Sequence, residues 1–66
     1  MKVDYKVLGG RPQEAELDEE ATVGDLKSQL GLSRHTASVN GNPADDDEEL
    51  NDGDFVTLSE PVKGGI

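Results

Sequence analysis

Two glycines close to the carboxyl end of the chain, Gly64 and Gly65, are the residues whose type and spacing point most directly to chemistry. Neither glycine has a Cβ atom, so the pair can pass through a slot too narrow for other side chains. Such a narrow segment suits a partner enzyme that must reach and activate a terminal carboxylate. Ile66 follows the second glycine, so this chemistry first requires the removal of one residue. The alternative is a frayed chain end, because termini are often disordered.

Other reactive groups are scarce in this sequence. There is no cysteine, which excludes disulfide bonds and thiol chemistry, and the single histidine, His35, falls between a predicted helix and a predicted strand, where a solvated loop is the simpler interpretation. The acidic run from Asp45 to Glu49 lacks the alternating ligands and central glycine of an EF-hand loop, so we expect a solvated acidic loop without a metal. With no nucleophile and base set, the sequence predicts a protein that is not itself an enzyme.

The charge balance restricts the possible partners. Fifteen acidic and six basic residues give a formal net charge of −9 and an isoelectric point near 4.2. Nucleic acid is not an expected partner, because binding it means neutralising phosphates with Lys and Arg. A partner with a basic surface would be attracted. The general acidity of proteins in a salt-adapted organism explains the same composition equally well.

The length of 66 residues suits one small domain with a thin core. No apolar run approaches the roughly 20 residues of a membrane span. The opening residues Met1-Lys2-Val3-Asp4 lack the apolar segment of a signal peptide. We therefore expect a cytoplasmic monomer, with a folded domain at residues 1–61 and a flexible tail at residues 62–66.

The first twenty residues predict an antiparallel hairpin. Apolar and polar residues alternate from Met1 to Val7, which is the period of a half-buried strand. Gly9 to Pro12 indicates a turn. Ala15 and Leu17 then alternate with acidic residues and form the expected second strand.

A short helix is predicted between Thr22 and Gly31. Thr22 is a suitable N-cap and Asp25, three residues later, completes a weak capping box. Gly31 provides the left-handed residue that commonly ends a helix. One face of this helix carries the apolar residues Val23, Leu26 and Leu30. A helix this short is marginal alone and must pack its apolar face on the sheet.

The second half of the chain predicts short strands. Thr36 to Val39 ends at the turn pair Asn40-Gly41, Asn42 to Ala44 leads into the acidic run, and Phe55 to Leu58 is the last strand. Leu50 is the one apolar residue of the acidic stretch and is expected in the core. A right-handed crossover through the helix places the last strand parallel to the first, in the middle of the sheet. The expected class is α+β, a mixed sheet of four to five strands with one main helix across one face.

Phe55 is a candidate partner-binding residue. Val56 and Leu58 are two residues apart and share one face of the last strand, while Phe55 lies on the other. If the first face packs on the helix, Phe55 is an exposed aromatic residue on the open face of the sheet. The opposite assignment, with Phe55 in the core, is the alternative.

Four segments occur in an order and spacing that resemble the ubiquitin-like β-grasp proteins, above all the prokaryotic sulfur carriers of thiamin and molybdopterin synthesis and the archaeal small modifier proteins. These segments are Ala21-Thr22-Val23-Gly24-Asp25-Leu26, Val39-Asn40-Gly41, Asp52-Gly53-Asp54-Phe55-Val56-Thr57-Leu58 and Pro61-Val62-Lys63-Gly64-Gly65. The resemblance covers essentially the whole chain and implies a β-grasp fold.

The resemblance also implies a function for the tail. A ubiquitin-activating-type adenylating enzyme would use ATP to activate the carboxylate of Gly65, and Gly64 would keep the segment narrow. Val62 and Lys63 would be held by that partner, although Val62 could equally cover the edge of the core. Most sulfur carriers end on the second glycine, so Ile66 departs from the pattern and implies a Gly-Gly-specific peptidase that cuts after Gly65.

Two outcomes of activation remain open. The carboxyl group can be attached to lysines of target proteins, or it can become a thiocarboxylate that passes sulfur to a sulfur-accepting enzyme in cofactor or tRNA synthesis. The additional Ile66 favours the protein modifier, because conjugation systems occur together with peptidases that cut after Gly-Gly. An alternative of another class is a non-covalent β-grasp interaction module with an incidental tail.

Overall fold

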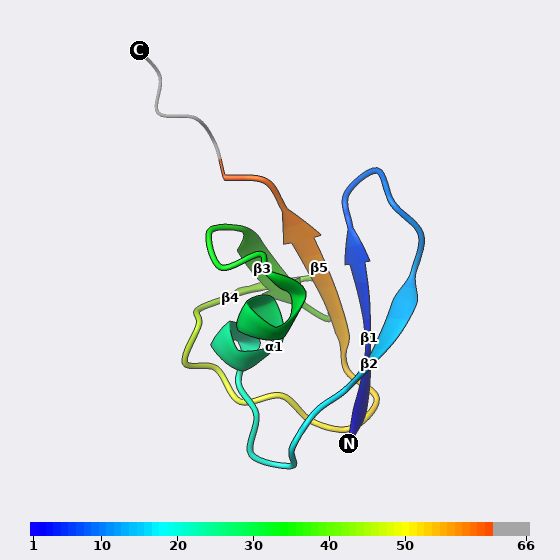
Figure 1. Cartoon of the computed structure of the whole chain (residues 1–66), viewed down its shortest axis with the longest axis vertical. Helices are drawn as coiled ribbons and strands as arrows, with labels where there is room; N and C mark the ends of the chain where they lie inside the picture. The colour runs from blue at the N-terminus through cyan, green and yellow to red at the C-terminus, as the bar shows by residue number, and fades with distance from the viewer. Residues whose placement is uncertain (62–66) are drawn as a thin grey trace.

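The structure, a computed structural model, describes residues 1–61. Its strands are β1 (Lys2–Val7), β2 (Gln13–Glu16), β3 (Thr36–Val39), β4 (Asn42–Ala44) and β5 (Phe55–Ser59), and its helix is α1 (Val23–Leu30). The strands form one sheet in the order β2-β1-β5-β3-β4, and α1 lies across one face of it (Figure 1). This arrangement confirms the predicted α+β class and the β-grasp fold.

The hairpin of β1 and β2 forms where the alternation predicts it. The two strands are antiparallel, and Val3, opposite Ala15, begins the buried face. Gly9 in the connecting loop has a φ of 87°, which a residue with a side chain rarely adopts. Leu17 was expected within the second strand but lies one residue beyond β2, and its N–H still donates to the carbonyl of Met1 (2.8 Å).

The helix α1 has both of its predicted caps. The Thr22 side chain accepts from the N–H of Asp25 (3.3 Å), and the Asp25 carboxylate accepts from the N–H of Thr22 (2.9 Å). Gly31 is left-handed, with a φ of 73°, and the N–H of Leu32 donates to the carbonyl of Lys27 (2.8 Å). These bonds complete the capping box and the left-handed ending that the residue types predict.

The last strand, β5, lies at the centre of the sheet. It is parallel to β1, with Tyr5 opposite Val56, and antiparallel to β3, with Ala37 opposite Leu58. The helix provides the crossover between the hairpin and the later strands, as predicted. The parallel pairing puts the carboxyl ends of β1 and β5 at the same edge of the sheet.

The structure corrects one prediction for the region before the acidic run. Asn42 to Ala44 was expected only as a connection, but it forms the strand β4, antiparallel to β3. Asn40 (φ 52°) and Gly41 (φ 87°) are both left-handed, the conformation of a two-residue hairpin turn. Pro43 lies within β4, which is an edge strand, where a missing N–H is tolerated.

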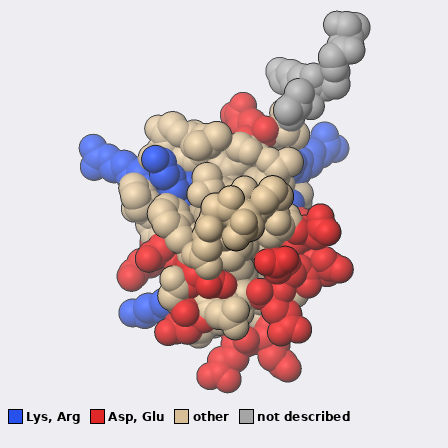
Figure 2. Space-filling model, turned by 180° about the vertical axis from the view of Figure 1, so that it is seen from behind, with Lys and Arg blue, Asp and Glu red and all other residues tan. Residues whose placement is uncertain are grey.

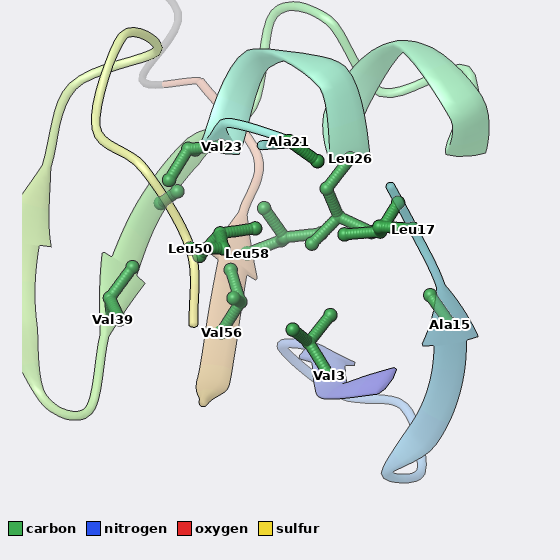
Figure 3. Packing of buried hydrophobic residues seen from close by; sticks show 11 residues of the cluster. Val3, Ala15, Leu17, Ala21, Val23, Leu26, Val39, Leu50, Val56 and Leu58 are labelled. Carbon is green, nitrogen blue, oxygen red and sulfur yellow. The ribbon is translucent and has the colours of Figure 1, made fainter. Parts of the chain in front are cut away.

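Between the helix and the sheet lies one apolar core (Figure 3). Val23 and Leu26 of α1 and Val56 and Leu58 of β5 are fully buried. Leu50 exposes only 2% of its surface and fills the core from the segment before β5, as predicted. The buried members of this core are Val3, Ala15, Leu17, Ala21, Val23, Leu26, Ala37, Val39, Leu50, Val56 and Leu58.

The acidic run from Asp45 to Glu49 is exposed, as expected, but it also holds the amino-terminal end of α1. The N–H of Val23 donates to the carbonyl of Glu48 (2.9 Å), and the N–H of Gly24 donates to that of Asp46 (2.8 Å). The Asp46 carboxylate pairs with the Lys27 ammonium at 2.6 Å. The run is therefore a structural part of the fold as well as a solvated loop.

No helix in the described part of the chain combines the length and apolar character needed to cross a membrane.

Candidate functional site at the carboxyl end of the central strand

The candidate site begins where β5 leaves the sheet. β5 ends at Ser59, and Glu60 and the exposed Pro61 follow it. The predicted activation residues Gly64 and Gly65, the predicted cleavage at Ile66 and the predicted contacts at Val62 and Lys63 lie outside the described residues. The structure therefore describes where this segment leaves the folded domain, which is at Pro61 after β5.

The strand that carries the tail is firmly anchored. Leu58 is fully buried, and its carbonyl accepts from the N–H of Leu8 (2.8 Å), which continues the pairing with β1. On the other side, the hydroxyl groups of Ser59 and Thr36 lie 2.6 Å apart. The segment after Pro61 thus starts from the best-packed strand of the domain, held on both sides.

Phe55 lies on the open face of the sheet, as predicted, with 39% of its surface exposed. Val56 and Leu58 occupy the opposite, buried face. Asn40 holds the backbone of Phe55 through two bonds, one from its N–H to the Phe55 carbonyl (2.8 Å) and one from the Phe55 N–H to its side-chain oxygen (3.1 Å).

Phe55 is nevertheless remote from the start of the tail. It begins β5, whereas the tail follows the end of β5. Four residue steps along a strand span about 13 Å. The structure therefore does not bring Phe55 together with the tail, and a partner that contacts both must cover most of one sheet face.

An exposed leucine at the tail end was missed by the sequence analysis. Leu8 exposes 63% of its surface, directly after β1 and beside the end of β5. The sequence could have predicted this exposure, because Leu8 continues the series of Lys2, Asp4 and Lys6, the polar positions of the alternation. An apolar residue at a polar position of a strand is a candidate contact.

The remaining polar side chains of the described residues do not gather into a reactive site. Residues 1–61 contain no group of three or more His, Asp or Glu side chains positioned to hold a metal ion. His35 is half-buried, and its N–H donates to the carbonyl of Leu32 (3.0 Å) in the loop after α1. A shallow hollow lined by Asp18, Glu19, Glu20, Ala21 and Asp25 lies where the segment between β2 and α1 meets the start of the helix.

Several solved structures share this fold. SAMP1 from Haloferax volcanii is 25% identical, with a TM-score of 0.74 over 98% of this chain and 100% of that chain. A putative molybdopterin converting factor subunit 1 from Pyrococcus furiosus is 29% identical, with a TM-score of 0.77 over 92% of this chain and 98% of that chain. A ubiquitin from Caldiarchaeum subterraneum is 26% identical, with a TM-score of 0.74 over 98% of both chains.

The sequence comparisons give a more specific result. No curated protein matches the chain at a significant level. A family model described as small archaeal modifier protein 2 matches residues 1–62, which is nearly the whole chain and includes every strand and the helix. The chain therefore belongs to the family of small archaeal modifier protein 2.

Proposed function

We propose that the protein is a ubiquitin-like modifier whose Gly65 carboxylate is adenylated and then attached to lysines of target proteins. The observation that carries this proposal is the family match over residues 1–62, in a chain that continues with Lys63-Gly64-Gly65. The anchored end of β5 supports it, because a narrow segment leaving a rigid domain can enter a partner's active site while the domain docks outside.

The proposed chemistry takes place on a partner enzyme. An oxygen of the Gly65 carboxylate attacks the α-phosphorus of ATP and pyrophosphate leaves, which gives an acyl-adenylate. A lysine amine of the target then attacks the carbonyl carbon, AMP leaves with its electron pair, and the nitrogen loses a proton. The protein itself supplies the carboxylate and the docking surface, and we propose that it acts in the cytoplasm without a catalytic group or bound cofactor of its own.

Removal of Ile66 is the first step of this proposal. Ile66 follows the second glycine, so the carbonyl carbon of Gly65 lies in a peptide bond until that bond is cut. A β-branched side chain would have to enter a slot that suits glycine, and the reactive carbon would lie one residue too far along. A peptidase that cuts after Gly65 removes both obstacles.

ATP–pyrophosphate exchange with the adenylating enzyme of the source organism tests the proposal. The chain ending at Gly65 should support exchange, and the chain ending at Ile66 should not. Gly65→Ala in the trimmed chain should abolish most of the exchange while the circular dichroism spectrum stays unchanged, because a Cβ would enter the slot. Equal exchange by the full-length and trimmed chains would refute the processing step.

A second candidate function is supported by the similarity to the putative molybdopterin converting factor subunit 1. In that case sulfide, rather than a lysine amine, would displace AMP and leave a thiocarboxylate on Gly65. Intact mass after incubation with the adenylating enzyme, ATP and a sulfide donor distinguishes the two, because replacement of one oxygen by sulfur changes the mass of the free protein. A folded, trimmed chain that supports no exchange would favour the non-covalent interaction module.

A further inference from the structure

Charge is distributed unevenly along the strands of this protein. Figure 2, which views the open face of the sheet, shows most of the acidic side chains in the middle and lower part and most of the basic side chains on both sides of the upper part, with one basic side chain at the lower left and one acidic side chain at the top. The strand β5, which leads to Pro61, ends at the upper end (Figure 1). A molecule with a net charge of −9 therefore presents cations around the point from which its tail departs.

The topology explains the basic end. β1 is parallel to β5, so the β1–β2 loop with the exposed Arg11 lies at the edge where β5 ends. β3 is antiparallel to β5, with Thr36 opposite Ser59, so the loop before β3 with the exposed Arg34 lies at the same edge. Within residues 1–61 neither guanidinium forms an ion pair or a hydrogen bond.

The acidic segments meet at the other end. The N–H of Lys2 donates to the Asp52 carboxylate (2.8 Å), which places the segment before β5 beside the start of β1. Thr22 forms an antiparallel bridge with Glu49, and the N–H of Leu50 donates to the carbonyl of Ala21 (3.0 Å). These contacts join the end of the acidic run to residues 18–20, the acidic segment after β2. At the tail end the carboxylate next to β5 is Glu60.

The length of the tail fixes which surface meets a partner. Only residues 62–65 separate Pro61 from the end of the Gly65 residue, and four residues span at most about 14 Å. If Gly65 reaches a reaction centre inside a partner, the mouth of that site must lie within this distance of Pro61. The loops on both sides of the tail then face the rim of the mouth.

We propose that Leu8, Arg11 and Arg34, named here the tail-side surface, dock on an acidic rim around the site that receives the tail. This inference rests on the proposed function. It predicts that the partner's rim carries carboxylates that face Arg11 and Arg34 and an apolar side chain that contacts Leu8. It differs from the expectation of a basic partner drawn from net charge. The acidic side chains at the far end of the sheet would repel an acidic rim, but β1 alone holds them about 20 Å away. At physiological salt the Debye length is about 8 Å, so screening reduces this repulsion to about a tenth.

The experiment compares two double variants of the chain ending at Gly65. Arg11→Gln with Arg34→Gln removes two positive charges at the tail end. Asn42→Asp with Asn51→Asp adds two negative charges at the far end, on exposed side chains of similar size. Both variants change the net charge from −9 to −11, because each carries two unit changes. Thermal melting checks that both are folded.

We expect the arginine variant to lower kcat/KM in ATP–pyrophosphate exchange about tenfold, through a higher KM, and the asparagine variant to change it less than about twofold. The loss should shrink as salt approaches about 1 M, where the Debye length is about 3 Å. Leu8→Ala should also raise KM, but by a factor that salt does not reduce.

Three results would overturn the inference. Equal losses in the two double variants would mean that net charge, not the tail-side surface, controls docking. Sedimentation that shows self-association of the trimmed chain at low salt, absent from the arginine variant, would identify a second copy of the chain as the occupant. No exchange by the folded, trimmed wild type would refute the proposed function and this inference with it, whereas the first two results leave the proposed function intact.

Discussion

Replacing Asp46 by asparagine should destabilise the protein, whereas the same replacement at Asp47 should not. The Lys27 side chain is only 7% exposed and its ammonium group pairs with Asp46 at 2.6 Å. Asparagine removes the negative charge and leaves a buried ammonium group with a neutral acceptor. Asp47 forms no ion pair within residues 1–61, so its loss only reduces the repulsion within an acidic run.

The size of the effect follows from the burial of the two partners. Breaking a fully buried pair costs about 3–5 kcal/mol, and an exposed pair contributes about 0–1 kcal/mol. Here Lys27 is buried but the Asp46 side chain is 64% exposed, so water reaches one side of the pair. The asparagine oxygen also still accepts a hydrogen bond. We therefore expect a loss of about 1–2 kcal/mol, and each kcal/mol lowers the Tm of a domain this small by about 4–8 °C.

Urea and thermal unfolding followed by circular dichroism measure this difference directly. Lys27→Met provides a control, because methionine fills the space of the lysine stem without the charge and should be neutral or stabilising. In the Lys27→Met background, Asp46→Asn should cost much less than in the wild type. Equal Tm values for Asp46→Asn and Asp47→Asn would refute the structural role assigned to this pair.

Three further substitutions have separate expected outcomes. Leu26→Ala should lower the free energy of unfolding by about 2–5 kcal/mol, because Leu26 is fully buried beneath α1, and a loss under about 0.5 kcal/mol in urea unfolding would contradict that packing. Gly24→Ala should destabilise by about 1–3 kcal/mol although alanine favours helices, because its Cβ would lie 3.1 Å from the carbonyl oxygen of Asp46, and a higher Tm than the wild type would show that the loop moves freely. Phe55→Ala should lower kcat/KM in ATP–pyrophosphate exchange at least about tenfold if Phe55 is a partner contact. Thr57→Ala, on the same face of β5, is the control, and equal kcat/KM values for the two variants would remove Phe55 from the docking surface.

Local signals in the sequence predicted most of the fold. The caps at Thr22 and Gly31 lie within one turn of the helix ends they determine, so residue type alone identified both. The alternation of Val56 and Leu58 identified the buried face of β5 and therefore the exposed position of Phe55. Leu50 was assigned to the core because a lone apolar residue in an acidic stretch is best explained by burial.

Features that a segment's own residue pattern does not indicate were not predicted. β4 is three residues long and contains a proline, so its own residues do not indicate a strand, and it forms because the turn at Asn40 and Gly41 folds it back on β3. The pair of Lys27 and Asp46 joins residues 19 apart in sequence, and no periodicity connects them.

The arrangement of the candidate site was also beyond local signals. Net charge suggested a basic partner, but the strand directions gather Arg11 and Arg34 at the tail end and carry the acidic segments away from it. The positions of Gly64 and Gly65 could be recognised from their types alone, since their proposed role depends on a narrow backbone and not on packing.

The most direct test of the central claim is a tryptic mass spectrum of the proteins of the source organism. Trypsin cuts after Lys63, so a target lysine joined to Gly65 should retain a Gly-Gly remnant. We expect such remnants in the wild-type strain, their disappearance when the gene is deleted and their return with the wild-type gene but not with Gly65→Ala. Remnants that retain Ile66, or a free protein that always ends at Ile66 with no modified lysine, would contradict it.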